Sequence, residues 1–154
     1  MNKSKSLGVI VPFFNEEKFL NESIKKLLKL DIIDQIILVD DCSTDISYSI
    51  AADISNNNDK VTVTKTTSNE GKGNAVKVGL GFIRTSHVII HDADLEYFPE
   101  DIPELFDIAL KNPNSLVLGS RTIKGKERDN KYVLTYFANK IYTYLFSLIN
   151  GKRL

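Results

Sequence analysis

Two acidic residues separated by one position, Asp92 and Asp94, follow an apolar run in this chain of 154 residues. In an extended strand end, residues two apart point the same way, so both carboxylates would lie on one side with only the small Ala93 between them. Two carboxylates suit Mg²⁺ or Mn²⁺, because they leave positions for water and for the oxygens of a diphosphate. Glu96 adds a third carboxylate if the backbone stays extended. An Asp-x-Asp pattern is also typical of a helix cap or a solvated loop, so the rest of the chain must decide.

Two other polar clusters contain residues that could bind a ligand. Asp40 and Asp41 follow a β-branched run, where a carboxylate either accepts hydrogen bonds from a base or ribose or caps the next helix. Gly71 and Gly73, with Lys72 between them, permit close approach of the backbone to a phosphate at a helix start. The glycines complete neither a P-loop nor the GxGxxG pattern, which disfavours a nicotinamide-binding domain.

The remaining reactive side chains carry weaker signals. His87 and His91 share one face of a strand by parity and are expected to be partly buried sheet residues. Cys42 is the only cysteine, which excludes an internal disulfide and fits a reducing compartment, so we expect a cytoplasmic protein. Arg121 has two open readings, which are a phosphate contact and a surface salt bridge.

Strand and helix patterns alternate along the chain and would position these clusters. Short apolar or β-branched runs predict strands at residues 7–11, 36–39, 61–66, 87–90 and 116–118. Apolar residues at helical spacing predict helices within residues 19–28, 46–54, 75–83 and 101–110, the second capped by Ser43, Thr44 or Asp45. This alternation predicts an α/β fold with a mostly parallel sheet covered by helices on both faces. Ligands of such sheets bind beyond the carboxyl ends of the strands, where four polar clusters would converge: residues 15–16, 40–41, 69–73 and 92–96.

The composition is that of an ordinary globular protein, with 42% hydrophobic and 26% charged residues, and predicts one domain over residues 1–154. Twenty basic residues balance twenty acidic ones, so no overall field favours nucleic acid. No apolar run is long enough for a signal peptide or a membrane span.

Taken together, five motifs resemble glycosyltransferase family 2, and most closely its dolichyl-phosphate mannose and polyprenyl-phosphate glucose synthase branch. They are Val9-Ile10-Val11-Pro12-Phe13-Phe14-Asn15-Glu16, Leu38-Val39-Asp40-Asp41-Cys42-Ser43-Thr44-Asp45, Asn69-Glu70-Gly71-Lys72-Gly73, Asp92-Ala93-Asp94-Leu95-Glu96 and Gly119-Ser120-Arg121. The resemblance implies a GT-A fold, which is a Rossmann-like nucleotide-binding domain, and a reaction that inverts the anomeric centre. Phe14 stands where the family usually has Tyr, and Glu96 where Gln is frequent. The family domain normally continues past the position of Leu154, so the resemblance also implies that most of the acceptor side is missing.

The resemblance also implies roles for individual residues. The nucleotide sugar would be bound by Pro12, Phe14, Glu16, Asp40, Asp41, Lys72, Asp92 and Ala93. The metal would be held by Asp92, Asp94 and Glu96, and the catalytic residues would be Asp94 and Arg121, with Arg121 on the diphosphate or the acceptor phosphate.

The expected reaction moves a hexose from a UDP- or GDP-linked sugar to a polyprenyl or dolichyl phosphate or another glycan acceptor. A lipid phosphate needs no general base, since it is already largely ionised near neutral pH. The aromatic-rich, helix-periodic stretch at residues 132–148 fits either a helix on a membrane surface or a helix packed against protein. Two rival functions remain open: a non-catalytic module that binds nucleotide sugars, and a phosphatase or phosphotransferase of the haloacid dehalogenase type, in which the Asp pair follows the first strand rather than the fourth.

Overall fold

The structure is a computed structural model, and it describes residues 5–119. The chain divides into two units after Leu118, and the elements described below belong to the first unit. The single domain expected over residues 1–154 stays a prediction. Strands and helices alternate through the first unit in this order: β1 (Leu7–Phe13), α1 (Leu20–Leu28), β2 (Ile33–Asp40), α2 (Ser47–Asn56), β3 (Val61–Lys65), α3 (Lys72–Leu80), β4 (His87–Ile90), the 3₁₀ helix η1 (Pro99–Asp101) and α4 (Ile102–Lys111).

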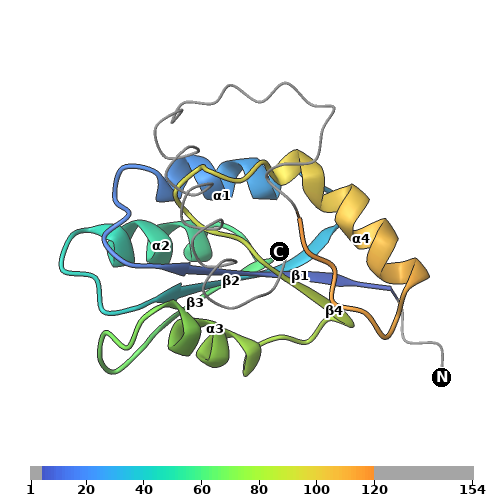
Figure 1. The fold of residues 1–154 in the computed structure, drawn as a ribbon. Coiled ribbons are helices and arrows are strands. Elements are labelled where there is room, and N and C mark those ends of the chain that lie inside the picture. Colours follow the sequence, from blue (N-terminus) through green and yellow to red (C-terminus); the bar gives the residue numbers. More distant parts are fainter. Residues whose placement is uncertain (1–4, 120–154) are drawn as a thin grey trace, which may run out of the picture. The chain divides into compact units, whose positions relative to one another are not determined.

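The four strands form one parallel sheet in the order β3-β2-β1-β4. β1 lies between β2 and β4, and all seven of its residues are buried. Figure 1 shows α1, α2 and α4 on one face of the sheet and α3 on the other. The predicted α/β architecture with a parallel sheet covered on both faces is therefore confirmed.

Alternation along the strands divides the core into two layers. Val9, Val11 and Leu38 face α1, α2 and α4 in the larger cluster of buried residues. Ile10, Ile37 and Val39 face α3 in the smaller cluster. Since successive side chains point to opposite faces, one apolar run supplies both layers, as expected for a sheet buried on both sides.

A glycine lets α3 approach the sheet closely. A Cβ atom added to Gly79 would come within 2.7 Å of Ile10 Cγ2 and 3.1 Å of Val39 Cγ2, which is closer than normal van der Waals contact. The helix therefore packs with its backbone against β1 and β2 at this point, and its first turn is held at the end of the sheet where the polar loops lie.

Two details differ from the sequence predictions. The fifth strand predicted at residues 116–118 is wrong, because these residues have no strand structure and Leu116 and Leu118 are 85% and 76% exposed. A run of three apolar residues behind a turn does not reach a strand with which to pair, so β4 is an edge strand among residues 5–119. The cap of α2 predicted at Ser43, Thr44 or Asp45 is also wrong, because the N-cap residue is Ile46 and makes no side-chain cap hydrogen bond. Asp45 contributes one residue earlier, where its Oδ1 accepts a hydrogen bond from the Ser47 N–H group at 2.9 Å.

His87 is a partly buried residue of β4, as expected, whereas His91 follows the strand and is almost fully buried. His87 is half-buried, with its ring 5.3 Å from that of Phe106 in an edge-on contact, and His91 is 4% exposed. Within the part of the chain that the structure describes, no helix has the length and apolar character needed to cross a bilayer.

Candidate functional site

A cavity of about 200 Å³ lies at the carboxyl ends of β1, β2 and β4 and at the first turn of α3. It is lined by Pro12, Phe13, Phe14, Glu16, Asp41, Lys72, Asp92, Ala93 and Asp94. The structure thus brings together residues from the four polar clusters, as the strand ends of a parallel sheet require. Of the residues expected to contact a nucleotide sugar, only Asp40 does not line this cavity.

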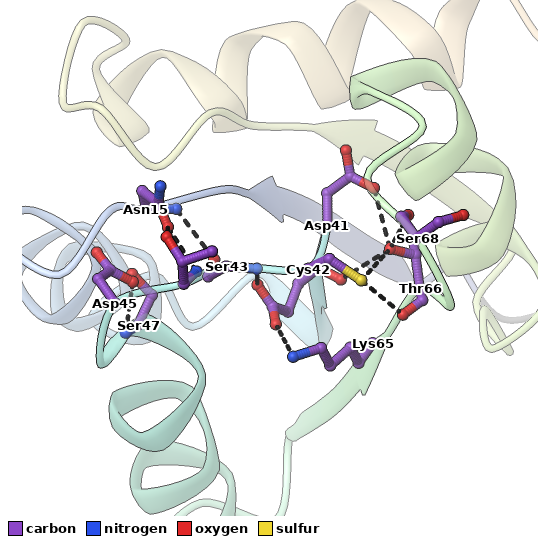
Figure 2. A network of polar contacts seen from close by, with 11 residues as sticks. Asn15, Asp41, Cys42, Ser43, Asp45, Ser47, Lys65, Thr66 and Ser68 are labelled. Carbon is purple, nitrogen blue, oxygen red and sulfur yellow. Dashed lines mark hydrogen bonds and ion pairs between the residues drawn. The ribbon is translucent and has the colours of Figure 1, made fainter.

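The two neighbouring aspartates at the end of β2 have different surroundings, and Figure 2 shows those of Asp41. Asp40 is fully buried, accepts a hydrogen bond from the Ser43 N–H group at 2.9 Å, and forms an ion pair with Lys65 at 3.3 Å. Its carboxylate therefore fixes the turn after β2 from inside the protein. Its expected contact with the nucleotide stays a prediction that this placement does not favour.

Asp41 lies at the cavity and also holds the loop that leads into α3. Its Oδ1 accepts hydrogen bonds from the Thr66 hydroxyl at 3.0 Å and from the Glu70 N–H group at 3.2 Å, and its Oδ2 accepts one from the Gly71 N–H group at 2.7 Å. Gly71 has a φ of 87°, a conformation that glycine adopts without steric cost. Asp41 therefore positions the start of α3, and Lys72 with it.

The loop after β1 is braced against the loop after β2. Asn15, which has a φ of 56°, donates its N–H to Ser43 Oγ at 3.0 Å and accepts at its Oδ1 from the Thr44 N–H group at 2.8 Å. The Glu16 N–H group donates to Ser47 Oγ at 2.8 Å. These reciprocal bonds, part of which Figure 2 shows, fix the backbone that carries Phe14 and Glu16 into the cavity.

An ion pair crosses from α3 to the loop after β4. The Lys72 ammonium lies 2.6 Å from Asp92 Oδ1 and 2.7 Å from Asp92 Oδ2. Asp94, on the same loop, accepts the Glu96 N–H group at its Oδ1 at 3.0 Å. Leu95 between them has a φ of 61°, so the backbone turns and does not stay extended. Glu96 is consequently exposed and does not line the cavity, and its expected role as a metal ligand lacks the extended backbone on which it depended.

The cavity carries an excess of negative charge. Partial burial, and then repulsion by Asp94, Asp45 and Asp92, raise the pKa of Glu16 above its ordinary value. Four carboxylates line the cavity, those of Glu16, Asp41, Asp92 and Asp94, whereas Lys72 is the only cation among its described lining residues. Such a cavity favours the binding of further positive charge.

The donor set fits a hard divalent cation, since Asp92 and Asp94 offer carboxylate oxygens in one cavity. Among residues 5–119, no group of three or more acidic, histidine or cysteine side chains is arranged to hold a metal on its own. This combination suits Mg²⁺ or Mn²⁺, which commonly take one or two carboxylates and complete their shell with water and phosphate oxygens.

Several residues that hold the loops of the site were not predicted from the sequence to have this role. The hydroxyl groups of Thr66, Ser43 and Ser47 hold the three loops in place. Their only signal is position, because Thr66 ends the strand predicted at residues 61–66 and the two serines follow the strand predicted at residues 36–39. Arg121 and the aromatic stretch at residues 132–148 lie outside the described residues.

Comparison with known proteins identifies the family of the chain. Residues 8–152 match the family model described as glycosyl transferase family 2. The chain is 32% identical over 126 residues to a dolichol-phosphate mannosyltransferase of Pyrococcus furiosus, a match that covers 80% of this chain and 35% of that protein. A dolichol-phosphate mannosyltransferase of Mycosarcoma maydis is 31% identical over 141 residues, with coverage of 86% and 48%. The chain thus spans less than half of the length of these two relatives.

Solved structures share the fold. A mannosyltransferase from Pyrobaculum calidifontis, in complex with GDP-Man and Mn²⁺, superposes with a TM-score of 0.54 at 27% identity, covering 57% of this chain and 27% of that one. The S. aureus protein TarS, residues 1–349 in complex with UDP-GlcNAc, superposes with a TM-score of 0.62 at 24% identity, covering 78% and 38%, and supports the fold alone. Both are GT-A glycosyltransferases, and the sheet described above is of this type. Because the family model matches residues 8–152, which is nearly the whole chain, the chain belongs to glycosyl transferase family 2.

Proposed function

We propose that this chain provides the donor site of a glycosyltransferase that moves a hexose from a UDP- or GDP-linked sugar to a polyprenyl or dolichyl phosphate, with inversion at the anomeric carbon. The observation that carries the proposal is the cavity at the strand ends, in which Asp92, Asp94 and Lys72 lie together beside the aromatic ring of Phe14. A diphosphate needs cationic partners, and a nucleoside base needs an apolar face on which to stack.

Six of the lining residues then have a role in donor binding. Phe14, 43% exposed, offers its ring to the base, and Glu16 and Asp41 offer acceptors to base or ribose groups. Asp92 and Asp94 would hold the divalent cation, and Lys72 would contact the phosphates. Bound there, Mg²⁺ or Mn²⁺ would act as a Lewis acid that neutralises the leaving nucleoside diphosphate.

The acceptor oxygen attacks the anomeric carbon from the face opposite the departing diphosphate, so the carbon–oxygen bond to the donor breaks as the new bond forms. A phosphate with a second pKa of about 6 already carries the attacking charge at neutral pH. No residue that lines the cavity is needed as a general base for such an acceptor. We place Arg121 on the diphosphate or the acceptor phosphate. We also place the reaction at the cytoplasmic face of a membrane, where a lipid phosphate would be presented.

Calorimetric titration tests the donor site. We expect GDP-mannose or UDP-linked sugars to bind in the presence of Mn²⁺ and to bind far more weakly in EDTA. Asp94→Asn should abolish the increase in nucleotide-sugar affinity that Mn²⁺ causes. Asp53→Asn, at an exposed position on α2, should leave this increase unchanged. Absence of metal-dependent binding for every nucleotide sugar would sink the proposal.

Product formation tests the transfer step. With a polyprenyl phosphate as acceptor, a radiolabelled hexose should move into the lipid phase. Metal-dependent donor binding without product would instead support the rival reading of a non-catalytic module that binds nucleotide sugars. Release of inorganic phosphate from a phosphate ester would support the phosphotransferase class.

A further inference from the structure

The cation and one of the carboxylates of the cavity neutralise each other in this structure. Lys72 Nζ lies 2.6 and 2.7 Å from the two carboxylate oxygens of Asp92, so both partners of the proposed donor site are occupied by one another. The side chain of Lys72 is 57% exposed and that of Asp92 is 22% exposed. An ion pair with this much exposure is weak and can be exchanged without a large cost.

The space and the charge in the cavity favour such an exchange. A volume of about 200 Å³ is below the roughly 300–1,000 Å³ that is typical of small-molecule sites, so the lining side chains, Lys72 among them, would contact a nucleotide sugar that enters. Lys72 is a long, flexible side chain at the first position of α3, between Gly71 and Gly73, and a Cβ atom added to either glycine would meet no atom within 4 Å. The side chain of Lys72 therefore has room to change its rotamer.

We infer that Lys72 is an exchangeable counter-ion that couples metal binding to donor binding. Without ligands its ammonium occupies the carboxylate of Asp92. When the diphosphate arrives, the ammonium moves from Asp92 to a phosphate oxygen, and the carboxylate of Asp92 becomes free for the divalent cation. This inference rests on the proposed function, because it assigns an order of events to the same site.

Through this exchange, the binding of either ligand makes the binding of the other more favourable. A metal that binds alone must displace or repel the ammonium, and a nucleotide that binds alone must draw the ammonium away from Asp92. When both bind, each takes the partner that the other has released. The metal and the diphosphate should therefore bind with reciprocal positive coupling, part of which depends on Lys72.

Titration with Mn²⁺ alone tests the first half of the exchange and requires no nucleotide. We expect Lys72→Met to bind Mn²⁺ about 3–5-fold more tightly than the wild type, because the competing ammonium is gone. Lys77→Met removes an exposed lysine from the same helix and should stay within about twofold of the wild type. Unchanged or weaker Mn²⁺ binding by Lys72→Met would overturn the inference.

A double-mutant cycle with UDP and with GDP, measured in EDTA, tests the second half. Asp92→Asn should tighten nucleotide binding by about threefold more in the presence of Lys72 than in the Lys72→Met background, because only then does it release an ammonium. Asp94→Asn controls for simple repulsion of phosphate and should have the same effect in both backgrounds, since its carboxylate is not paired with Lys72. Equal effects of Asp92→Asn in both backgrounds would refute the exchange.

The two arms separate this inference from the proposed function. If no variant binds UDP or GDP with or without Mn²⁺, the proposed donor site is wrong. A tighter Mn²⁺ complex of Lys72→Met would then still support the competition between Lys72 and the metal, and its absence would refute that competition too.

Discussion

Thr66 is the residue on which the loop before α3 depends, and replacing it by valine should weaken the fold. Its hydroxyl group is buried, with the side chain 6% exposed, and lies 3.0 Å from Asp41 Oδ1 and 2.8 Å from the Ser68 carbonyl oxygen. The hydroxyl has one proton, which these two acceptor oxygens share, so replacing it removes the only side-chain donor that Thr66 offers them (Figure 2). Valine has nearly the same shape and no donor.

The cost follows from the charge of the acceptor. A hydrogen bond to a charged group contributes about 1.5–3 kcal/mol, and the Asp41 carboxylate would keep only the N–H groups of Glu70 and Gly71. We therefore expect Thr66→Val to lose about 1.5–3 kcal/mol of unfolding free energy. For a chain of this length, that loss lowers the melting temperature by about 3–12 °C.

Urea denaturation followed by circular dichroism measures the loss, and the conservative variant supplies the control. Thr66→Ser keeps the hydroxyl and should recover most of the lost stability, although it lacks a methyl group. Nucleotide affinity in the presence of Mn²⁺ should fall in Thr66→Val and recover in Thr66→Ser, because Asp41 positions the start of α3. A valine variant as stable as the wild type would show that the hydroxyl does not hold Asp41.

Three further predictions concern other parts of the site and its supports. Asp94→Asn should weaken Mn²⁺-dependent nucleotide binding by at least about tenfold in calorimetry while unfolding free energy changes by less than about 0.5 kcal/mol. Because the pKa of Glu16 is raised, its charge opposes folding, so the wild type loses stability as pH rises through that pKa. Glu16→Gln should therefore melt at a higher temperature than the wild type at pH 8, and the difference should vanish in acid; a constant difference would contradict the assignment. Gly79→Ala should be about 1–3 kcal/mol less stable than Gly73→Ala in urea denaturation, since only the former meets Ile10, and equal stabilities would contradict the close packing of α3.

The order of strands and helices could be predicted from the sequence because local periodicity determines it. The run at residues 36–39 is apolar throughout, as buried parallel strands are, and β4 carries three apolar residues in succession after His87. The helices carry their apolar residues at helical spacing. The run at residues 116–118 has the same composition but forms no strand. A strand exists only where a partner offers a ladder of hydrogen bonds, and three residues carry too little pattern to show whether one does.

The membership of the cavity could largely be predicted, because clusters at the ends of parallel strands converge. The different roles of Asp40, which is buried in the turn, and Asp41, which lines the cavity, could not be predicted. The chain leaves the strand between them, so their directions depend on the turn after β2, in which Cys42 has a φ of 62°. The roles of Thr66, Ser43 and Ser47 depend on contacts between loops that are 25 or more residues apart in sequence, and periodicity does not report such contacts.

The position of β1 in the sheet has a consequence for how the chain is made. β1 is synthesised first, but it pairs with β2 on one side and with β4 on the other, where Leu7 meets His87. At 5–20 residues per second, a ribosome takes about 4–15 s to pass from the end of β1 to the end of β4. During that time one edge of the most apolar strand has no native neighbour, and pairings between residues so far apart in sequence form slowly. We therefore expect the nascent chain to engage holding chaperones until β4 has emerged, and the donor cavity to form late in folding because β1 and β4 both contribute to it.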